Sequence, residues 1–291
     1  MSRKTIDPFS VIMSNRLFGN LRSIKSLFLL LAMTLVASSW GQGQKDSGVF
    51  TIGGTNIHYE TYGTGEPLLL LHGWTQSSQF WLEYVADYAK HFKVYAIDLH
   101  GHGKSSILTK DFSIQKTAQD IFQLIEHLKL KQVNAIGLSF GGLVLLEIAA
   151  SHPKLLSNMI LIGTSNSFKG GDNQKRAITY ENLPDSFRNQ LKGLHLHGEN
   201  QIRAMFDPNL NYEINLSASQ LALIEIKTMI VQGDRDEITG VEPALFLYRN
   251  LPNSELWIVP NTGHIAITDK NKKAFLTKSI GFFASGDSKH E

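Results

Sequence analysis

Residues 133–142 read Val-Asn-Ala-Ile-Gly-Leu-Ser-Phe-Gly-Gly, and they stand directly before a helix-like run that extends to Ala150. The first part of this stretch is short and almost continuously apolar, which is typical of a strand buried on both faces of a parallel sheet. A chain that passes abruptly from strand to helix strains the residue at the apex, Ser139, and needs very small residues two positions to either side. Gly137 and Gly141 meet that need. The stretch therefore predicts a sharp turn that presents the Ser139 hydroxyl above the C-terminal edge of a sheet.

Short apolar runs of the same kind occur along the rest of the chain. They are Pro67–Leu71, Val94–Ile97, Met159–Ile162, Thr228–Val231 and Leu256–Val259. Helix-like segments alternate with them, and the clearest is Ser113 to Leu130, in which Ser113 can cap a helix whose apolar residues recur at three- and four-residue spacing. This alternation predicts an α/β fold, with a mostly parallel sheet and helices on both of its faces.

Two segments depart from the alternation. Val49 to Thr61 contains two short alternating runs around Gly53-Gly54, which predicts an antiparallel hairpin. Residues 166–223 are polar and helix-like, and they are too many for a simple connection in a compact domain. We therefore expect a core made of residues 48–165 and 224–284, with a helical cap insertion at 166–223.

The composition narrows the possible chemistry. The chain has 291 residues, of which 42% are hydrophobic, with 28 Lys and Arg against 26 Asp and Glu, as in soluble globular proteins. It contains no cysteine, which excludes disulfides, thiol nucleophiles and Cys-ligated metals.

The N-terminus has the pattern of a secretory signal peptide. Five basic residues in the first 25 precede the apolar stretch Leu27 to Ala37, and small or polar residues follow from Ser38 to Gln42. A membrane-spanning helix needs roughly 17 to 25 apolar residues, so cleavage is favoured over anchoring. We expect residues 1–39 to be a signal peptide of a periplasmic or secreted protein, with Gly41 as a second cleavage position and Met13 as an alternative start. An uncleaved membrane anchor is the alternative.

Removal of residues 1–39 leaves 23 basic and 25 acidic residues, a net charge of −2. No remaining segment concentrates Lys and Arg among aromatic residues, so we expect no nucleic-acid partner. We likewise expect no stable membrane span after cleavage. The oligomeric state is not predicted.

Ser139 needs partners, because serine is a poor nucleophile unless a histidine takes its proton and a carboxylate orients that histidine. Gly233-Asp-Arg-Asp-Glu237 follows one predicted strand, and Asn261-Thr-Gly-His264 follows another. The C-terminal ends of parallel strands share one sheet edge, so His264 and one of Asp234, Asp236 or Glu237 can converge on Ser139. The order serine, acid, histidine also matches this architecture.

The first predicted buried strand, Pro67–Leu71, leads into His72-Gly73-Trp74. The oxyanion of a tetrahedral intermediate needs two donors, and the backbone N–H groups of Trp74 and Phe140 are the expected pair. His72 could instead be the catalytic base. We disfavour that role because His72 precedes the oxyanion loop and its chain order would be wrong.

Together these motifs resemble the α/β-hydrolase superfamily, specifically its serine esterase and lipase-like branch with a cap. The resemblance covers about residues 48–284 and rests on five motifs in the family's order. They are His72-Gly-Trp74, Asp98-Leu-His-Gly-His-Gly-Lys-Ser105, Gly137-Leu-Ser-Phe-Gly141, Gly233-Asp-Arg-Asp236 and Gly263-His264. The family's acid lies three residues after the strand-ending glycine, which selects Asp236.

The resemblance also separates this chain from other branches. Haloalkane dehalogenases and epoxide hydrolases of this fold carry Asp where this chain has Ser139. Proline iminopeptidases have a His-Gly-Gly-Pro-Gly loop, and perhydrolases usually follow the loop Trp with Pro, whereas this chain has Thr75.

We therefore expect a serine hydrolase that cleaves small-molecule carboxylic esters through an acyl-Ser139 intermediate. His264 is the expected general base and then acid, Asp236 orients it, and no metal or organic cofactor is needed. An amide or lactone hydrolase with the same triad is the runner-up. A hydrolase-fold protein that binds a ligand without turnover is the alternative from another class.

Three remaining features have structural explanations beside functional ones. We expect Asp98–Ser105 to brace the oxyanion loop. The pairs His100/His102 and His195/His197 lack a third ligand at a recognisable spacing, so metal binding is disfavoured. A group of large side chains in the insertion can line an acyl pocket or pack the insertion itself: Phe168, Tyr180, Phe187, Met205 and Phe206.

Overall fold

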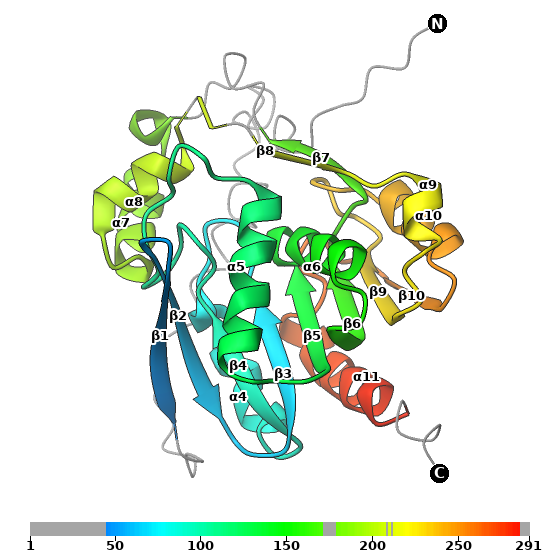
Figure 1. Cartoon of the computed structure of the whole chain (residues 1–291). Helices are drawn as coiled ribbons and strands as arrows, with labels where there is room; N and C mark the ends of the chain where they lie inside the picture. The colour runs from blue at the N-terminus through cyan, green and yellow to red at the C-terminus, as the bar shows by residue number, and fades with distance from the viewer. Residues whose placement is uncertain (1–44, 171–178, 208, 211, 286–291) are drawn as a thin grey trace, which may run out of the picture.

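The computed structural model describes residues 45–170, 179–207, 209–210 and 212–285. Its centre is an eight-stranded sheet with the strand order β1-β2-β4-β3-β5-β6-β9-β10 (Figure 1). The strands are β1 (Asp46–Ile52), β2 (Thr55–Tyr62), β3 (Glu66–Leu71), β4 (Phe92–Ile97), β5 (Val133–Leu138), β6 (Leu156–Ile162), β9 (Lys227–Gly233) and β10 (Ser254–Val259). The strands from β4 to β10 in this order are parallel, whereas β2 is antiparallel to both β1 and β4. Every apolar run predicted to be a buried strand is a strand, although β10 lies at the edge of the sheet and is only partly buried. The α/β fold is confirmed.

The predicted hairpin and the clearest predicted helix are both present. Gly53 and Gly54 connect β1 to β2 with φ of 53° and 83°, a left-handed turn that glycine adopts without strain. Helix α5 (Ile114–His127) is capped by Ser113, whose side chain accepts a hydrogen bond from the Lys116 N–H. The helix ends three residues before the predicted end at Leu130, because Lys129 has a left-handed φ of 55°.

Helices cover both faces of the sheet (Figure 1). One face packs against α5, α6 (Phe140–Ser151) and α10 (Glu242–Asn250). The other packs against the 3-10 turn η1 (Ser78–Trp81), α4 (Leu82–Tyr88) and α11 (Lys272–Ala284), and the 3-10 turn η4 (Asp269–Asn271) leads into α11. The two apolar cores hold the strands rigidly, so the loops at their C-terminal ends are presented from a fixed frame.

The segment between β6 and β9 leaves the core and returns to it at the same place. The Leu216 N–H donates to the Asn166 carbonyl at 2.9 Å, and the Asn166 amide donates to the Leu216 carbonyl at 3.0 Å. The elements between are β7 (Ser167–Gly170), η3 (Tyr180–Asn182), α7 (Asp185–Leu194), α8 (Gly198–Met205) and β8 (Tyr212–Asn215), and α9 (Ala218–Leu221) follows. We call residues 166–216, which are fewer than the expected 166–223, the insertion.

The insertion contains helices, as expected, and also two strands that the sequence analysis did not anticipate. β7 and β8 form a separate antiparallel pair, which lies above α6 in Figure 1. The helices have a small core of their own, made of Tyr180, Leu183, Leu191 and Ile202 with Phe187 and Phe206 packed against it. Phe187, Phe206 and Tyr180 therefore stabilise the insertion.

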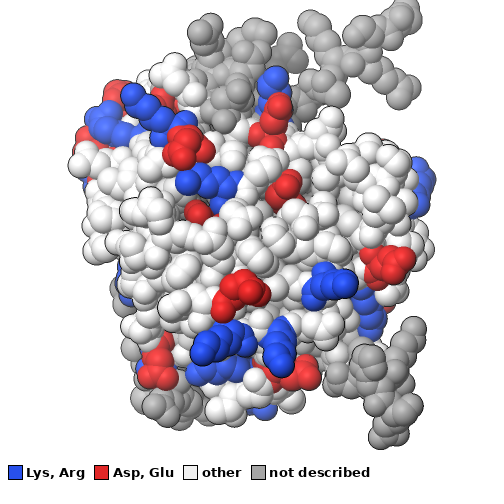
Figure 2. Space-filling model, viewed as in Figure 1, with Lys and Arg blue, Asp and Glu red and all other residues white. Residues whose placement is uncertain are grey.

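The surface carries charges of both signs. On the face seen in Figure 2, Lys and Arg are interspersed with Asp and Glu. Within the described residues, no helix has the length and apolar character to cross a membrane. The expected signal peptide, residues 1–39, lies outside the described residues.

Candidate active site

Ser139 stands at the turn between β5 and α6. Its backbone has φ 50° and ψ −111°, a strained conformation for a residue with a side chain, and its N–H donates to the Ile162 carbonyl at 2.8 Å. A Cβ atom at Gly137 would lie 2.5 Å from the Gly141 carbonyl oxygen, and one at Gly141 would overlap the Leu71 carbonyl. The turn thus requires both glycines, and the strain it imposes is typical of functional sites.

Asp236 and His264 lie on the loops that follow β9 and β10. The Nδ1 atom of His264 is 2.9 Å from Oδ2 of Asp236. Asp236 is buried, whereas the other two acidic candidates, Asp234 and Glu237, are exposed. The structure therefore joins His264 to the acid that the resemblance selects.

The surroundings of Asp236 keep it ionised. Its Oδ1 accepts hydrogen bonds from the backbone of Ile238 and Thr239, and its Oδ2 accepts from the side chains of Gln232 and Thr239 as well as from His264. Burial opposes ionisation, but these donors and the charge of His264 hold the pKa of Asp236 far below its ordinary value. A carboxylate at this position accepts the proton on Nδ1 of His264, which leaves Nε2 as the atom with a free lone pair.

His264 reaches the end of the sheet that presents Ser139. Its ring packs against Gly163, where an added Cβ would lie 3.0 Å from both Cε1 and Nδ1. Gly163 directly follows Ile162, whose carbonyl holds the Ser139 N–H. Ser139, Asp236 and His264 thus gather at one sheet edge, although 97 and 28 residues separate them along the chain.

His72 is fully buried, and each of its ring nitrogens forms a hydrogen bond with the backbone. Its Nδ1 is 2.8 Å from the Gly73 carbonyl, and its Nε2 accepts the Leu99 N–H at 3.0 Å. The Leu99 N–H can only donate, so Nδ1 carries the proton and donates to Gly73. Burial lowers the pKa of His72, which favours this neutral form. Neither nitrogen is free to take a proton from Ser139, so His72 braces the loop.

This brace sets the direction of the Trp74 N–H. The Gly73 carbonyl also accepts the Gln76 N–H at 3.1 Å. In a trans peptide the carbonyl and the next N–H point in opposite directions, so holding the Gly73 carbonyl fixes the Trp74 N–H. Phe140 begins α6, and the three N–H groups after it donate to the carbonyls of His72 and Ser139. Trp74 and Phe140 both line the cavity beside Ser139.

A narrow cavity of about 20 Å³ opens beside Ser139. Its apolar walls are Trp74, Phe140, Leu143, Phe168, Tyr212 and Ile238. The Tyr212 ring stacks on Trp74 with 5.0 Å between ring centroids, and Phe168 lies 5.6 Å from Tyr212. The insertion thus supplies one side of the cavity through β7 and β8.

The large insertion residues that the sequence singled out are divided by the structure. Phe168 lines the cavity, Met205 is buried in α8, and the others belong to the insertion's own core. Tyr212 was missed. Its signal was the alternation of Tyr-Glu-Ile-Asn over residues 212–215, which is the pattern of a short strand with one buried face.

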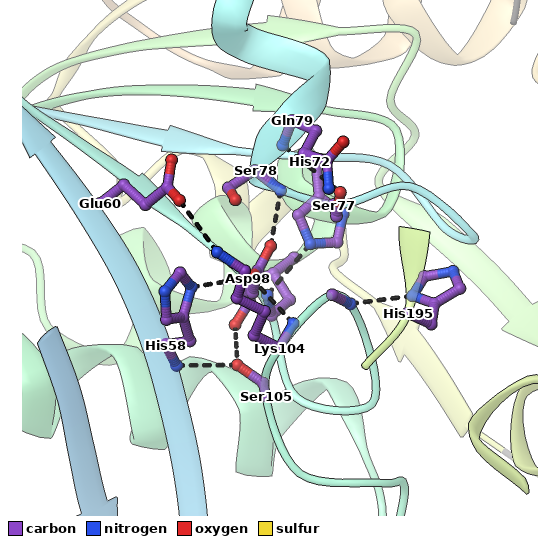
Figure 3. Close-up of polar contacts among 12 residues, drawn as sticks. His58, Glu60, His72, Ser77, Ser78, Gln79, Asp98, Lys104, Ser105 and His195 are labelled. Carbon is purple, nitrogen blue, oxygen red and sulfur yellow. Dashed lines mark hydrogen bonds and ion pairs between the residues drawn. The ribbon is translucent and has the colours of Figure 1, made fainter. Parts of the chain in front are cut away.

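Asp98 lies at the centre of a buried polar network (Figure 3). Its Oδ1 accepts the Ser78 N–H at 2.6 Å, and its Oδ2 accepts from His58 Nδ1 and the Lys104 N–H, both at 2.9 Å. Burial opposes ionisation of Asp98, but these hydrogen bonds lower its pKa to about 2. Through Ser78 and Lys104 the network ties the 98–105 loop to the segment after the oxyanion loop, which is the bracing role that the sequence predicts.

Two of the histidines considered as metal ligands belong to this loop and form hydrogen bonds with backbone carbonyls in or next to it. Nε2 of His100 is 3.2 Å from the Ile107 carbonyl, and Nδ1 of His102 is 3.0 Å from the His100 carbonyl. In the part of the chain that the structure describes, no three His, Asp or Glu side chains are arranged to hold a metal ion.

Comparison with known proteins agrees with this fold. Residues 66–206 match the family described as the alpha/beta hydrolase fold. The chain has the α/β-hydrolase fold. A pimeloyl-[acyl-carrier protein] methyl ester esterase of Vibrio vulnificus is 28% identical to this hydrolase over 238 residues, which cover 72% of this chain and 91% of that protein.

Two solved structures have the same fold. The esterase RhEst1 from a Rhodococcus species aligns with a TM-score of 0.68 and 23% identity, covering 83% of this chain and 98% of its own. A hydrolase from Pseudomonas aeruginosa aligns with a TM-score of 0.68 and 18% identity, covering 82% of this chain and 98% of its own.

Proposed function

We propose that this protein is a serine hydrolase that cleaves carboxylic esters through an acyl-Ser139 intermediate. The observation that carries the proposal is the strained turn that raises Ser139 at the sheet edge where Asp236 and His264 form a 2.9 Å pair. An esterase function also agrees with the name of the Vibrio relative, which covers most of this chain. The chemistry needs no cofactor.

In the acylation step, Ser139 Oγ attacks the ester carbonyl carbon while Nε2 of His264 takes the hydroxyl proton. Asp236 stabilises the imidazolium that forms, since its carboxylate accepts the proton on Nδ1. The carbonyl oxygen becomes an oxyanion, which the N–H groups of Trp74 and Phe140 stabilise. The bond to the alcohol oxygen then breaks, and that oxygen receives the proton held by His264.

Deacylation repeats these steps with water. His264 takes a proton from the water molecule as its oxygen attacks the acyl carbon, and the same two N–H groups stabilise the second oxyanion. The bond to Ser139 Oγ breaks, Oγ recovers a proton from His264, and the carboxylic acid leaves. The enzyme returns to its starting state.

The test compares wild type with Ser139→Ala on p-nitrophenyl acetate and butyrate, and with Ser165→Ala as a matched control. Ser165 lines the same cavity but donates its hydroxyl proton to the Ser167 carbonyl. Ser139→Ala should lower kcat by at least about a thousandfold, and the control by less than about threefold. A fluorophosphonate should label wild type and the control at Ser139. A p-nitroanilide and a γ-lactone extend the series to amides and cyclic esters.

A loss below about tenfold in Ser139→Ala would mean that the nucleophile lies elsewhere. Faster turnover of the anilide or the lactone than of the acyclic esters would replace the ester assignment with the amide or lactone one. Failure of folded wild type to react with the fluorophosphonate or any of these substrates would favour a ligand-binding protein.

We also propose that the protein is exported after cleavage near Ser39. The support is the sequence pattern of residues 1–42. Expression of the full chain in a bacterium, followed by fractionation and N-terminal sequencing, tests this. Export requires a periplasmic or secreted product that begins at Trp40 or Gln42, whereas an intact N-terminus in the membrane fraction would indicate an anchor.

A further inference from the structure

His195 connects the insertion to two loops of the core. It follows α7 directly, and only 3% of its surface is exposed. Its Nδ1 is 2.9 Å from the Gly103 nitrogen, and its Nε2 is 3.2 Å from the Thr75 carbonyl oxygen. Figure 3 shows His195 approaching the loop beside Lys104 from the insertion. The mechanism proposed above does not use this buried side chain.

The partners of His195 determine which nitrogen carries the proton. A backbone N–H can only donate, so Nδ1 must accept the hydrogen bond from Gly103. The proton of the neutral ring then lies on Nε2, where it can be donated to the Thr75 carbonyl. One tautomer therefore satisfies both contacts, and it makes His195 a donor to the oxyanion loop.

The carbonyl that His195 holds belongs to a strained part of this loop. Thr75 has φ of 63°, which is unfavourable for a β-branched residue and persists only where neighbouring contacts enforce it. The Thr75 carbonyl and the Gln76 N–H are the two ends of one planar peptide, so fixing the carbonyl also fixes the N–H. The Gln76 N–H donates to the Gly73 carbonyl. That carbonyl shares a peptide with the Trp74 N–H.

We propose that His195 is a positioning residue: by holding the Thr75 carbonyl it aligns two successive peptides and so aims the Trp74 N–H at the oxyanion. This inference rests on the proposed function, which makes that N–H an oxyanion donor. Its consequence is that the oxyanion hole is complete only when the insertion is seated on the core. The insertion then contributes to the rate of the chemical steps as well as to substrate choice.

Other hydrogen bonds from α8 and from the residue after His195 end on a different loop. The Leu196 N–H donates to the Gly103 carbonyl at 2.8 Å, and the Gln201 amide donates to the carbonyls of Gly103 and Ser105 at 3.3 and 3.2 Å. These bonds hold α7 and α8 against the 98–105 loop without contacting the oxyanion loop. They provide a control for effects of the insertion's stability alone.

Substitution of His195 by asparagine or by glutamine tests its two hydrogen bonds one at a time. Asparagine can place its oxygen near the position of Nδ1, which keeps the Gly103 bond and loses the Thr75 bond. Glutamine can place its nitrogen near the position of Nε2, which keeps the Thr75 bond and loses the Gly103 bond. His195→Asn, His195→Gln and the control Gln201→Leu are compared by kcat and KM on p-nitrophenyl acetate, with folding checked by urea denaturation.

His195→Asn should lower kcat by about 10- to 100-fold with KM within about threefold of wild type, because a misplaced donor mainly weakens binding of the transition state. His195→Gln should retain kcat within about threefold, and Gln201→Leu should lose stability without that loss of kcat. If His195→Asn does not fold, His195→Met replaces it, since a flexible apolar side chain of similar size is tolerated in cores. The same loss of kcat is expected.

Equal losses of kcat in the Asn and Gln variants, or a kcat retained in the Asn or Met variant, would overturn the role of His195. The proposed ester hydrolase function would still stand in that case, provided that wild type hydrolyses the ester and Ser139→Ala does not. Wild type that neither hydrolyses esters nor reacts at Ser139 would instead overturn the proposed function itself.

Discussion

The hydrogen-bond donors around Asp236 require a carboxylate at this position. Gln232 and Thr239 direct N–H and O–H groups at the same oxygen that accepts from His264. An amide in place of the carboxylate must therefore turn an NH₂ group toward other donors or toward His264. An NH₂ group that faces His264 disfavours the tautomer that has Nε2 free, whereas one that faces the other donors loses hydrogen bonds that hold the side chain in place. In both arrangements the negative charge that stabilises the imidazolium is lost.

Asp236→Asn should accordingly lower kcat by about 10³- to 10⁴-fold with little change in KM. Steady-state kinetics on p-nitrophenyl acetate measure this. The matched control is Glu237→Gln, which changes an exposed carboxylate next to it and should leave kcat within about twofold. A retained kcat in Asp236→Asn would assign the acid to another residue.

For single residues of the site, the sequence predicts the position of those that follow strand ends. It does not predict the position of those held by tertiary contacts. Ser139 and His264 are found because local turns and the sheet edge determine their positions. His195 lies after a helix of the insertion, and its partners Thr75 and Gly103 are distant in the chain. No local pattern encodes such contacts, so only the assembled structure places His195 beside the oxyanion loop.

Among the elements, β8 determines the size of the cavity beside Ser139. Tyr212 stacks on Trp74 and closes one side of this narrow cavity. Both Tyr212 and Phe168 are buried against neighbouring rings, so neither turns aside easily. Short acyl groups should therefore be preferred.

Tyr212→Ala should shift the preferred p-nitrophenyl ester from acetate towards butyrate and hexanoate, because it removes a wall of the cavity. The comparison is kcat/KM over the chain-length series, and a gain of about tenfold on hexanoate relative to acetate is expected from added apolar contact. Phe187→Leu, which alters the insertion's own core, should leave the ratio unchanged. An unchanged ratio in Tyr212→Ala would place the acyl group elsewhere.

The elements of the core follow from sequence more completely than those of the insertion. Buried parallel strands such as β3 and β5 are short, almost continuously apolar runs bounded by turn residues, a pattern that sequence shows directly. β7 and β8 have four residues each and are partly polar, so their pairing depends on contact with α5 and α6. The end of α5 was also misplaced, since apolar periodicity continues past the residue whose left-handed backbone ends the helix.

For the molecule as a whole, buried histidines make stability depend on pH. His72, His102 and His195 are each at most 3% exposed, and burial lowers the pKa of all three, that of His195 to about 4. In the unfolded chain a histidine titrates near pH 6.5. Below that pH the unfolded state binds more protons than the folded state, so stability decreases as the pH falls.

The free energy of unfolding should therefore drop between about pH 7 and pH 4, with His195 alone contributing about 3 kcal/mol. Urea denaturation at pH 7, 6 and 5 measures the slope. His195→Gln should reduce this slope by an amount that corresponds to the uptake of up to one proton on unfolding. Gln201→Leu removes no titratable group, so it should lower stability equally at each pH. A slope that is the same in His195→Gln and wild type would contradict this account.

The hydrogen bonds between Asn166 and Leu216 close the base of the insertion. Since the chain leaves and re-enters the core at one place, this unit can be exchanged for that of another hydrolase without displacing β6 or β9. Such a graft would carry more than a new acyl pocket. A donor segment without a group to hold the Thr75 carbonyl would yield a well-folded chimera with a defective catalyst, so modularity in the fold does not extend to modularity in the reaction.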